Sequence, residues 1–335
     1  MSKHWRAAVI VSACIAGLGL FPASAQEPRE FSFGVIGDLA YSPAEEPLLA
    51  NVLEELNRTP LAFVVHVGDL GSPRNGACTD ELWARRLAQF RASTNPLIYT
   101  PGDNEWTDCH AQQGVPGGDP LERLAKLRSV FFNGEQSFGQ RTIARVRQSS
   151  SGGKFEKYRE NVRWDLGGIT FLTLHVVGSN NGLGRAPDGD AEFAERNGAD
   201  IAWLHEGFKH AQASNSRAIM IFQQANMYPE FLPFPGDPKR DGPGFTDLRT
   251  ALGKEAVAFG KPVVLVHGDS HYFRVDKPYT RLRRGPEDPT IENLTRVESF
   301  GTPNHHWLQV TVEVSDPNVF TFRPRIIAAN VLKVR

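Results

Sequence analysis

Apolar runs and amphipathic stretches alternate along the first half of this chain. The apolar runs predict buried strands at 31–37, 61–67 and 96–100. The segments between and after them carry apolar residues at helical spacing, which predicts helices at 43–57, 79–92 and 119–130. Strands and helices that alternate in this way predict parallel strands in one sheet.

The second half continues the alternation with two additions. A hairpin is expected over 160–174, turning at Gly167 and Gly168, and the end of the chain predicts antiparallel strands at 306–313 and 318–327. The remaining elements are expected as helices near 198–212 and 245–259 and strands at 217–222 and 262–267. The polar segment 133–157 is interpreted as a mobile excursion, and 227–245 as an irregular surface loop. The predicted fold class is therefore α/β, as a four-layer α/β/β/α sandwich of two packed mixed sheets flanked by helices.

The first 25 residues predict a secretory signal peptide. Lys3 and Arg6 form a basic start, residues 7–21 are apolar, and residues 23–25 (Ala-Ser-Ala) suit cleavage after Ala25. A retained membrane anchor is the alternative, but the apolar run is short for a span. We therefore expect a signal peptide over 1–25, one domain over 26–335 without a membrane span, and a periplasmic or secreted location.

Composition limits the partners that this chain can bind. The chain is 40% hydrophobic and 22% charged, and its formal net charge is −1. Nothing in this balance indicates the broad basic surface that a nucleic-acid-binding protein needs. The oligomeric state is not indicated by the sequence.

Two cysteines remain after the predicted leader, Cys78 and Cys109. In an exported protein two cysteines favour a disulfide, here between the loop after Asp69 and the loop after Asp103. Two free thiols or a soft-metal site are the alternatives.

Four short segments share one design, in which an apolar run ends and an acidic residue follows a glycine. They contain Asp38, Asp69, Asp103, and Asp269 with His271. Such turns place carboxylates at the carboxyl edge of a sheet, where α/β proteins position their chemistry. Carboxylates held together repel one another unless cations lie among them. The pattern predicts a metal site, with two ions.

The ordered turns resemble the calcineurin-like metallophosphoesterase superfamily, including its purple acid phosphatase branch. Asp38 stands at the first family signature, residues 68–69 (Gly-Asp) at the second and residues 102–105 (Gly-Asp-Asn-Glu) at the third. Gln223 stands at the fourth and residues 268–271 (Gly-Asp-Ser-His) at the fifth. The resemblance covers nearly all of residues 26–335.

Several positions depart from the family pattern. Ala40 replaces a histidine of the first signature, although Tyr41 is placed to ligate as a tyrosine does in purple acid phosphatases. Asp103 replaces the family asparagine, and Gln223 and Asp269 replace metal-binding histidines. Asp38, Asp69 and His271 match without change.

The resemblance implies an exported, metal-dependent hydrolase of phosphoester bonds that acts on a small phosphorylated substrate. Asp69 would bridge two divalent or trivalent ions and a metal-activated water would attack the phosphorus. Because oxygen ligands replace imidazoles, Mn, Mg, Ca or Fe ions are favoured over Zn. The implied ligands of one ion are Asp38, His271 and Tyr41; those of the other are Asp103, Gln223 and Asp269.

The candidate catalytic residues are His175, Asn104 and Glu105. Asn104 stands where the family has its acid histidine, and an amide cannot titrate. Glu105, His175 and His267 are therefore candidate proton donors, and His175 is chosen because it follows a predicted strand at the same sheet edge. A structural hydrogen-bonding role is the alternative for either histidine.

Two other functional interpretations remain open. The replaced histidines also fit a catalytically inactive member of the fold that binds a phosphorylated ligand or partner. The block Gly268-Asp269-Ser270 is found in lipase-like serine hydrolases, but it lies late in this chain and no G-x-S-x-G elbow occurs elsewhere.

Overall fold

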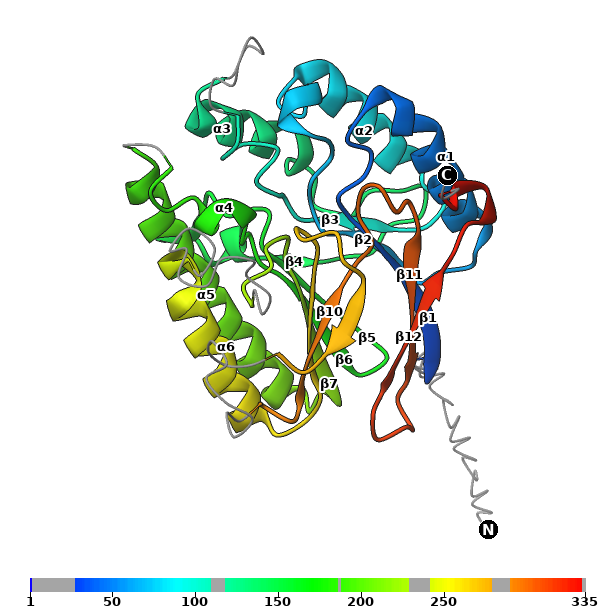
Figure 1. Ribbon diagram of the computed structural model, residues 1–335. Coiled ribbons are helices and arrows are strands. Elements are labelled where there is room, and N and C mark those ends of the chain that lie inside the picture. The colour runs from blue at the N-terminus through cyan, green and yellow to red at the C-terminus, as the bar shows by residue number, and fades with distance from the viewer. Residues whose placement is uncertain (2–27, 110–117, 186–187, 229–241, 279–289, 333–335) are drawn as a thin grey trace.

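The structure is a computed structural model of the 335-residue chain (Figure 1). It describes residue 1 and the ranges 28–109, 118–185, 188–228, 242–278 and 290–332. The predicted leader and most of the predicted loop 227–245 lie outside the described residues.

The first sheet has five strands in the order β12-β11-β1-β2-β3. Its parallel part consists of β1 (Glu30–Ile36), β2 (Val64–His66) and β3 (Leu97–Tyr99). The late strand β11 (Trp307–Glu313) pairs antiparallel with β1, and β12 (Phe320–Arg325) pairs antiparallel with β11, as the alternating sequence pattern predicted. The C-terminal end of the chain thus completes the sheet that the N-terminal end begins.

The second sheet has seven strands in the order β4-β5-β6-β7-β8-β10-β9. Four of them run parallel: β6 (Ile169–Thr173), β7 (Ala218–Phe222), β8 (Val263–His267) and β10 (Leu294–Glu298). The edges are antiparallel and consist of β4 (Val146–Arg147), β5 (Val162–Leu166) and β9 (Arg274–Asp276). Strands β5 and β6 form the predicted hairpin, whose turn places Gly167 and Gly168 at positive φ.

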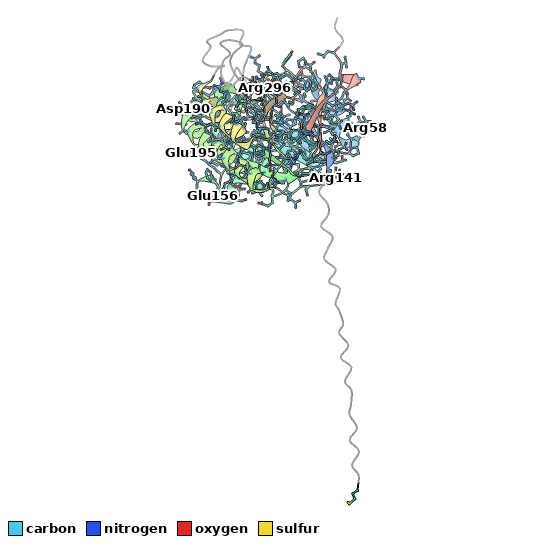
Figure 2. The ribbon with its side chains drawn as sticks, turned by 90° about the horizontal axis from the view of Figure 1, so that it is seen from below. Arg58, Arg141, Glu156, Asp190, Glu195 and Arg296 are labelled. Carbon is cyan, nitrogen blue, oxygen red and sulfur yellow. A yellow bond between two sulfur atoms is a disulfide. The ribbon has the colours of Figure 1, made fainter. Side chains whose placement is uncertain are left out.

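Helices cover the outer face of each sheet. The first sheet packs against α1 (Glu46–Arg58), α2 (Asp80–Ala92) and α3 (Pro120–Phe131), and the second against α5 (Gly189–Ala213) and α6 (Thr246–Phe259). Figure 1 shows α5 and α6 side by side, away from α1 and α2. In Figure 2, Asp190 and Glu195 on α5 lie on one side of the molecule and Arg58 of α1 lies on the other. The short α4 (Gly178–Asn181) follows β6, and 3₁₀ turns lie at Pro43–Glu45, Pro73–Asn75, Gln148–Ser151, Gly153–Phe155, Pro243–Phe245 and Ala328–Asn330.

The space between the sheets is filled by aromatic and β-branched side chains. Phe33 and Phe63 of the first sheet side stack at 4.5 Å between ring centroids. The ring of Phe171 meets Phe63 edge-on at 5.1 Å and stacks on Trp164 at 5.3 Å. All four rings are buried, and each ring of this size removes 150–250 Å² from water. The predicted four-layer α/β/β/α sandwich is confirmed.

Four elements differ from the sequence expectation. Helix α5 begins at Gly189, earlier than the expected start near 198. Part of the expected excursion 133–157 forms β4 at the sheet edge. Strands β9 and β10 were not predicted, because β10 carries the charged residues Arg296 and Glu298 at fully buried positions. Arg296 pairs there with Asp276, which compensates the burial of its charge.

The predicted disulfide between Cys78 and Cys109 is confirmed, with an S–S distance of 2.01 Å. Within the described ranges, no helix has the length and apolar character needed to span a bilayer.

Candidate metal centre

The candidate ligands lie where strands of the two sheets end. Asp38, Asp69 and Asp103 follow β1, β2 and β3, and Asp269 follows β8. Asp38, Asp69 and His271 each offer one ligand atom, and these three atoms lie within 4.8 Å of one another. Residues separated by more than two hundred positions thus meet at one site, as the sequence pattern predicted for the sheet edge.

The turns that carry these side chains are strained. Asp38, Asp69, Asp269 and His271 have φ angles of 55°, 58°, 76° and 60°, which places them in the left-handed region. Side-chain-bearing residues adopt this region at a cost of about 1–3 kcal/mol each, and such residues gather at functional sites. The backbone conformation that orients these four side chains therefore lowers the stability of the fold.

Glycines make room for the carboxylates. A Cβ atom on Gly268 would lie 2.1 Å from Asp38 Oδ2, and one on Gly102 would lie 2.0 Å from Asp69 Oδ1. A Cβ on Gly178 would lie 2.6 Å from Asp103 Oδ2 and 2.7 Å from Asp269 Oδ1. No larger residue fits at these positions without a shift of the site.

Tyr41 and His271 complete one half of the site. The Tyr41 hydroxyl donates a 2.6 Å hydrogen bond to Asp69 Oδ2 and lies 3.2 Å from His271 Nε2. His271 Nδ1 lies 2.7 Å from the carbonyl oxygen of Thr302, so Nδ1 carries the proton and donates it. This leaves the lone pair of Nε2, which lies 3.6 Å from Asp38 Oδ1, directed into the site. A carbonyl partner that fixes the tautomer in this way is typical of metal-binding histidines.

The other half of the site contains Asp103 and Asp269, and the neighbouring glutamine Gln224 contacts it. Gln224, not Gln223, reaches the carboxylates: its Nε2 lies 3.0 Å from Asp103 Oδ1 and 3.3 Å from Asp69 Oδ2. The Nε2 of Gln223 instead donates to the carbonyl oxygen of Ala225 at 2.9 Å. The backbone pairing of β7 continues for one residue beyond Phe222, to Gln223. Side chains alternate between the two faces of a strand, so Gln224 lies on the same face as Phe222, which packs toward the first sheet.

Burial and mutual repulsion shift the acidity of the carboxyl groups. Burial raises the pKa of Asp38 well above its usual range, and the charges of Asp269, Glu298 and Asp103 raise it further. Burial also raises the pKa of Asp69 and Asp103, each helped by a neighbouring carboxylate, and raises the pKa of Asp269 to about 6. Like charges in a buried site disfavour ionisation unless a cation is present.

His175 does not lie among these carboxylates. Its Nδ1 is 2.8 Å from Glu160 Oε1, and its Nε2 accepts a 3.1 Å hydrogen bond from the indole nitrogen of Trp106. Both ring nitrogens are thus engaged in the protein interior, and burial lowers the pKa of His175. The geometry gives His175 the structural role that was its alternative. His267 is also buried, and its Nδ1 lies 2.8 Å from the carbonyl oxygen of Gly268.

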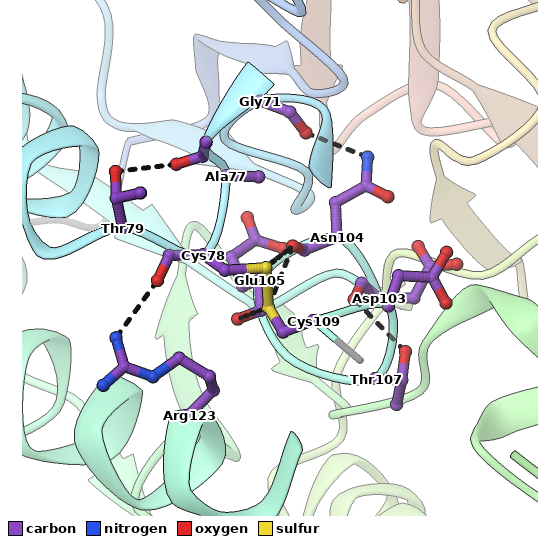
Figure 3. Close-up of a disulfide and its surroundings, with 12 residues drawn as sticks. Gly71, Ala77, Cys78, Thr79, Asp103, Asn104, Glu105, Thr107, Cys109 and Arg123 are labelled. Carbon is purple, nitrogen blue, oxygen red and sulfur yellow. Dashed lines mark hydrogen bonds between the residues drawn. A yellow bond between two sulfur atoms is a disulfide. The ribbon is translucent and has the colours of Figure 1, made fainter. Parts of the chain in front are cut away.

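Asn104 and Glu105 support the site through its loops. The backbone N–H of Asn104 donates to Asp69 Oδ1 at 3.2 Å, while its side-chain amide donates to the carbonyl oxygen of Gly71 at 2.9 Å (Figure 3). The buried Glu105 carboxylate accepts hydrogen bonds from the N–H groups of Leu70 at 2.6 Å and Gly102 at 3.0 Å. Glu105 therefore ties the second ligand loop to the third, and the nearby disulfide joins the same loops.

Two site residues were missed by the sequence interpretation. Gln224 had a signal, because it directly follows the chosen Gln223. Ser179 had none: its hydroxyl donates to Asp103 Oδ2 at 2.9 Å and lies 3.0 Å from Asp108 Oδ1. Ser179 is brought there by a left-handed turn over three consecutive residues, 179–181, with φ angles of 52°, 60° and 55°.

The donor set fits a bound cation. Asp38 Oδ2 is a buried carboxylate oxygen that has no hydrogen-bond partner in the described part of the chain. The Asp69 carboxylate and the His271 lone pair converge with it, and oxygen and imidazole atoms are the ligands of hard and borderline metal ions.

No protein-family model matches the chain, and no curated protein matches it by sequence. Among solved structures, it is similar to a Vps29 single mutant from Entamoeba histolytica, at 9% identity and a TM-score of 0.30, over 88% of this chain and 97% of that chain. It is also similar to a novel phosphatase from Mycoplasma pneumoniae, at 10% identity and a TM-score of 0.40, over 90% of this chain and 96% of that chain.

Proposed function

We propose that this protein is a metal-dependent hydrolase of phosphoester bonds, related to the metallophosphoesterase superfamily. The observation that carries the proposal is the convergence of Asp38, Asp69 and His271 within 4.8 Å, with Asp103 and Asp269 beside them. The two-sheet architecture and the order of the ligand loops support the same superfamily. The substrate class is a small phosphorylated compound.

Two metal ions would be held by this donor set. Asp38, His271 and Tyr41 would serve one ion, and Asp103 and Asp269 the other, with Asp69 between them. The Gln224 amide would orient Asp103 and Asp69 through its hydrogen bonds. When bound, such ions orient a phosphoryl group, neutralise its charge and lower the pKa of a water molecule. The excess of carboxylate oxygens favours Mn²⁺, Mg²⁺, Ca²⁺ or an iron ion over Zn²⁺.

The protein's own residues would orient this centre. The carbonyl oxygen of Thr302 holds the His271 ring, and the backbone N–H of Asn104 holds Asp69. In the described part of the chain, neither His175 nor Asn104 offers an acidic proton to a leaving group. The proposed reaction therefore suits phosphoesters whose leaving group needs little protonation.

Export is part of the proposal. The sequence of residues 1–25 predicts a leader, and the Cys78–Cys109 disulfide is typical of an oxidising compartment. We place the mature protein in the periplasm or outside the cell.

A metal-reconstituted assay tests the proposal. Mature protein is loaded with Mn²⁺ or Mg²⁺ and offered p-nitrophenyl phosphate and bis-p-nitrophenyl phosphate, whose leaving groups are good. We expect metal-dependent release of p-nitrophenol that Asp69→Asn lowers by at least about a hundredfold, which is about 2.7 kcal/mol of transition-state stabilisation. An unchanged rate in this variant would refute the bridging role of Asp69.

A second function is favoured by one observation, the engagement of His175 and Asn104 in structural hydrogen bonds. A member of this fold without turnover would bind a phosphorylated ligand or partner at the same centre. Metal-loaded protein that binds phosphate but hydrolyses neither ester would support this function over the hydrolase.

A further inference from the structure

Tyr272 is an exposed aromatic residue directly beside a candidate metal ligand. This residue is 67% exposed, and every other Phe, Tyr or Trp in the described ranges is buried or half-buried. It follows His271, whose Nε2 is directed into the site. A single exposed apolar residue is ordinary on a protein surface, so a functional role for Tyr272 depends on the contacts that hold it in place.

The segment from His271 to Arg274 is anchored on both sides. Phe273 stacks on Phe300, with ring centroids 4.6 Å apart and planes at 8°. The backbone N–H of Tyr272 donates to Glu298 Oε1 at 3.0 Å, which fixes the backbone from which the exposed ring projects. The ring is thus presented to solvent by a segment whose neighbours are held in the interior.

A buried ion pair supports one face of the ring. Arg274 Nε donates to Glu298 Oε2 at 2.7 Å, and Glu298 is fully buried. The guanidinium carbon of Arg274 lies 5.7 Å from the centroid of the Tyr272 ring, within the range of a cation–π contact. Glu298 therefore holds both the backbone of Tyr272 and the cation against its ring.

The position of Tyr272 in the chain places its backbone next to the metal centre. Tyr272 is bonded directly to His271, whose Nε2 lies 3.6 Å from Asp38 Oδ1. Glu298 on β10 is also opposite Arg274 on β9 in the antiparallel pairing of these strands. Strand β9 begins three residues after the ligand loop 268–271. The backbone of Tyr272 is consequently held beside the candidate centre, and its ring is exposed to solvent.

We propose that Tyr272 is a stacking platform for a planar aromatic group of the substrate, which would be an aryl phosphoester or a nucleotide. This inference rests on the proposed function, because the phosphoryl group would be held by the metal centre. The open face of the ring accepts any π-system, since stacking depends on ring faces and not on a particular hydrogen-bond pattern. The Arg274 guanidinium supports the opposite face.

Non-hydrolysable ligands test the platform separately from turnover. Binding of phenylphosphonate and methylphosphonate to Mn²⁺-loaded protein is measured by isothermal titration calorimetry, for the parent chain, Tyr272→Ala and Tyr272→Phe. Val257→Ala is the matched control, because Val257 is 65% exposed on α6, away from the centre. We expect about tenfold tighter binding of phenylphosphonate, a preference that Tyr272→Ala abolishes and that Tyr272→Phe and Val257→Ala retain.

The outcomes separate the two proposals. A preference that survives in Tyr272→Ala, or equal binding of both phosphonates by the parent chain, would overturn the platform and leave the metal centre intact. Failure of both phosphonates to bind would overturn the metal-centre proposal and the platform with it. A phosphonate analogue of AMP identifies the source of the ring: tighter binding than phenylphosphonate, lost in Tyr272→Ala, assigns a nucleotide, and weaker binding assigns a simple aryl ester.

Discussion

Gly102 lies so close to Asp69 that a side chain at residue 102 has no space. A Cβ atom there would stand 2.0 Å from Asp69 Oδ1 and 2.6 Å from the backbone nitrogen of Asp69. Because one of these atoms belongs to the backbone, a change of rotamer cannot relieve the overlap. The loop that carries Asp103 thus passes the loop that carries Asp69 too closely for any side chain at residue 102.

Gly102→Ala is expected to displace Asp69 and weaken the centre. Overpacking of a buried site costs about 1–3 kcal/mol of the free energy of unfolding, and the shift of Asp69 should also lower the affinity for Mn²⁺. Chemical denaturation and calorimetric titration with Mn²⁺ measure the two effects. Gly198→Ala on α5 is the control, because a Cβ there meets nothing within 4 Å and alanine is the better helix former. Equal stability and equal Mn²⁺ affinity in Gly102→Ala and the parent chain would contradict the expectation.

The two adjacent glutamines should differ in their effect on metal binding. Gln224→Ala removes the amide that contacts Asp103 and Asp69, and we expect an affinity for Mn²⁺ lower by about 10–100-fold. Gln223→Ala removes a contact with the carbonyl oxygen of Ala225 and should leave the affinity nearly unchanged. Calorimetric titration of both variants gives the comparison, with circular dichroism to verify folding. The reverse pattern would favour Gln223 as a metal ligand.

The disulfide should contribute to both stability and site geometry. It closes a loop of 31 residues between Cys78 and Cys109, which corresponds to about 3–4 kcal/mol in the chain-entropy description. We expect the double variant Cys78→Ser, Cys109→Ser to lose about this amount in urea unfolding and to bind Mn²⁺ more weakly. Reduction of the parent chain with dithiothreitol should reproduce the loss, and dithiothreitol should not change the double variant. A double variant as stable as the parent would show that the disulfide does not stabilise the fold.

Asp200 predicts a specific pH dependence. Burial raises the pKa of this carboxyl from 3.8 to about 8, partly opposed by Arg196 and by a hydrogen bond from Asn161. Between these values the folded chain holds a proton that the unfolded chain releases, so the free energy of unfolding falls as pH rises from about 4 to 8. Asp200→Asn removes this dependence and should exceed the parent in stability at pH 8 by on the order of 2 kcal/mol.

Urea unfolding of the parent and Asp200→Asn at pH 4, 6 and 8 measures the difference. The advantage of the variant should grow with pH and be smallest at pH 4. A difference that stays constant over this range would show that Asp200 is ionised in the folded protein.

The fold was largely predictable because its core follows simple periodic patterns. Strands β1, β2, β7 and β8 are apolar runs that end in glycine-containing or polar turns, and α1, α2 and α6 have clear helical spacing. Strand β10 escaped because its buried Arg296 and Glu298 interrupt the apolar pattern. Their burial depends on Asp276 and Arg274, partners from β9 that sequence periodicity does not reveal.

Site residues in the glycine-acid turns were predictable from the sequence. Residues whose role depends on the direction of a side chain were not. Asp38, Asp69 and His271 were found from the glycine-acid turns and lie together. The choice between Gln223 and Gln224 depended on where β7 ends, since one residue more reverses the face. The direction of the His175 ring depended on contacts with Trp106 and Glu160, which are 69 and 15 residues away and which periodicity does not reveal.

Metal content tests the central claim most directly. Mature protein and Asp69→Asn are equilibrated with Mn²⁺, separated from free ions by gel filtration and measured by inductively coupled plasma mass spectrometry. We predict two Mn²⁺ ions per chain for the parent and a loss of one or both in the variant. A parent chain that retains no metal, or a variant that retains as much as the parent, would contradict the account.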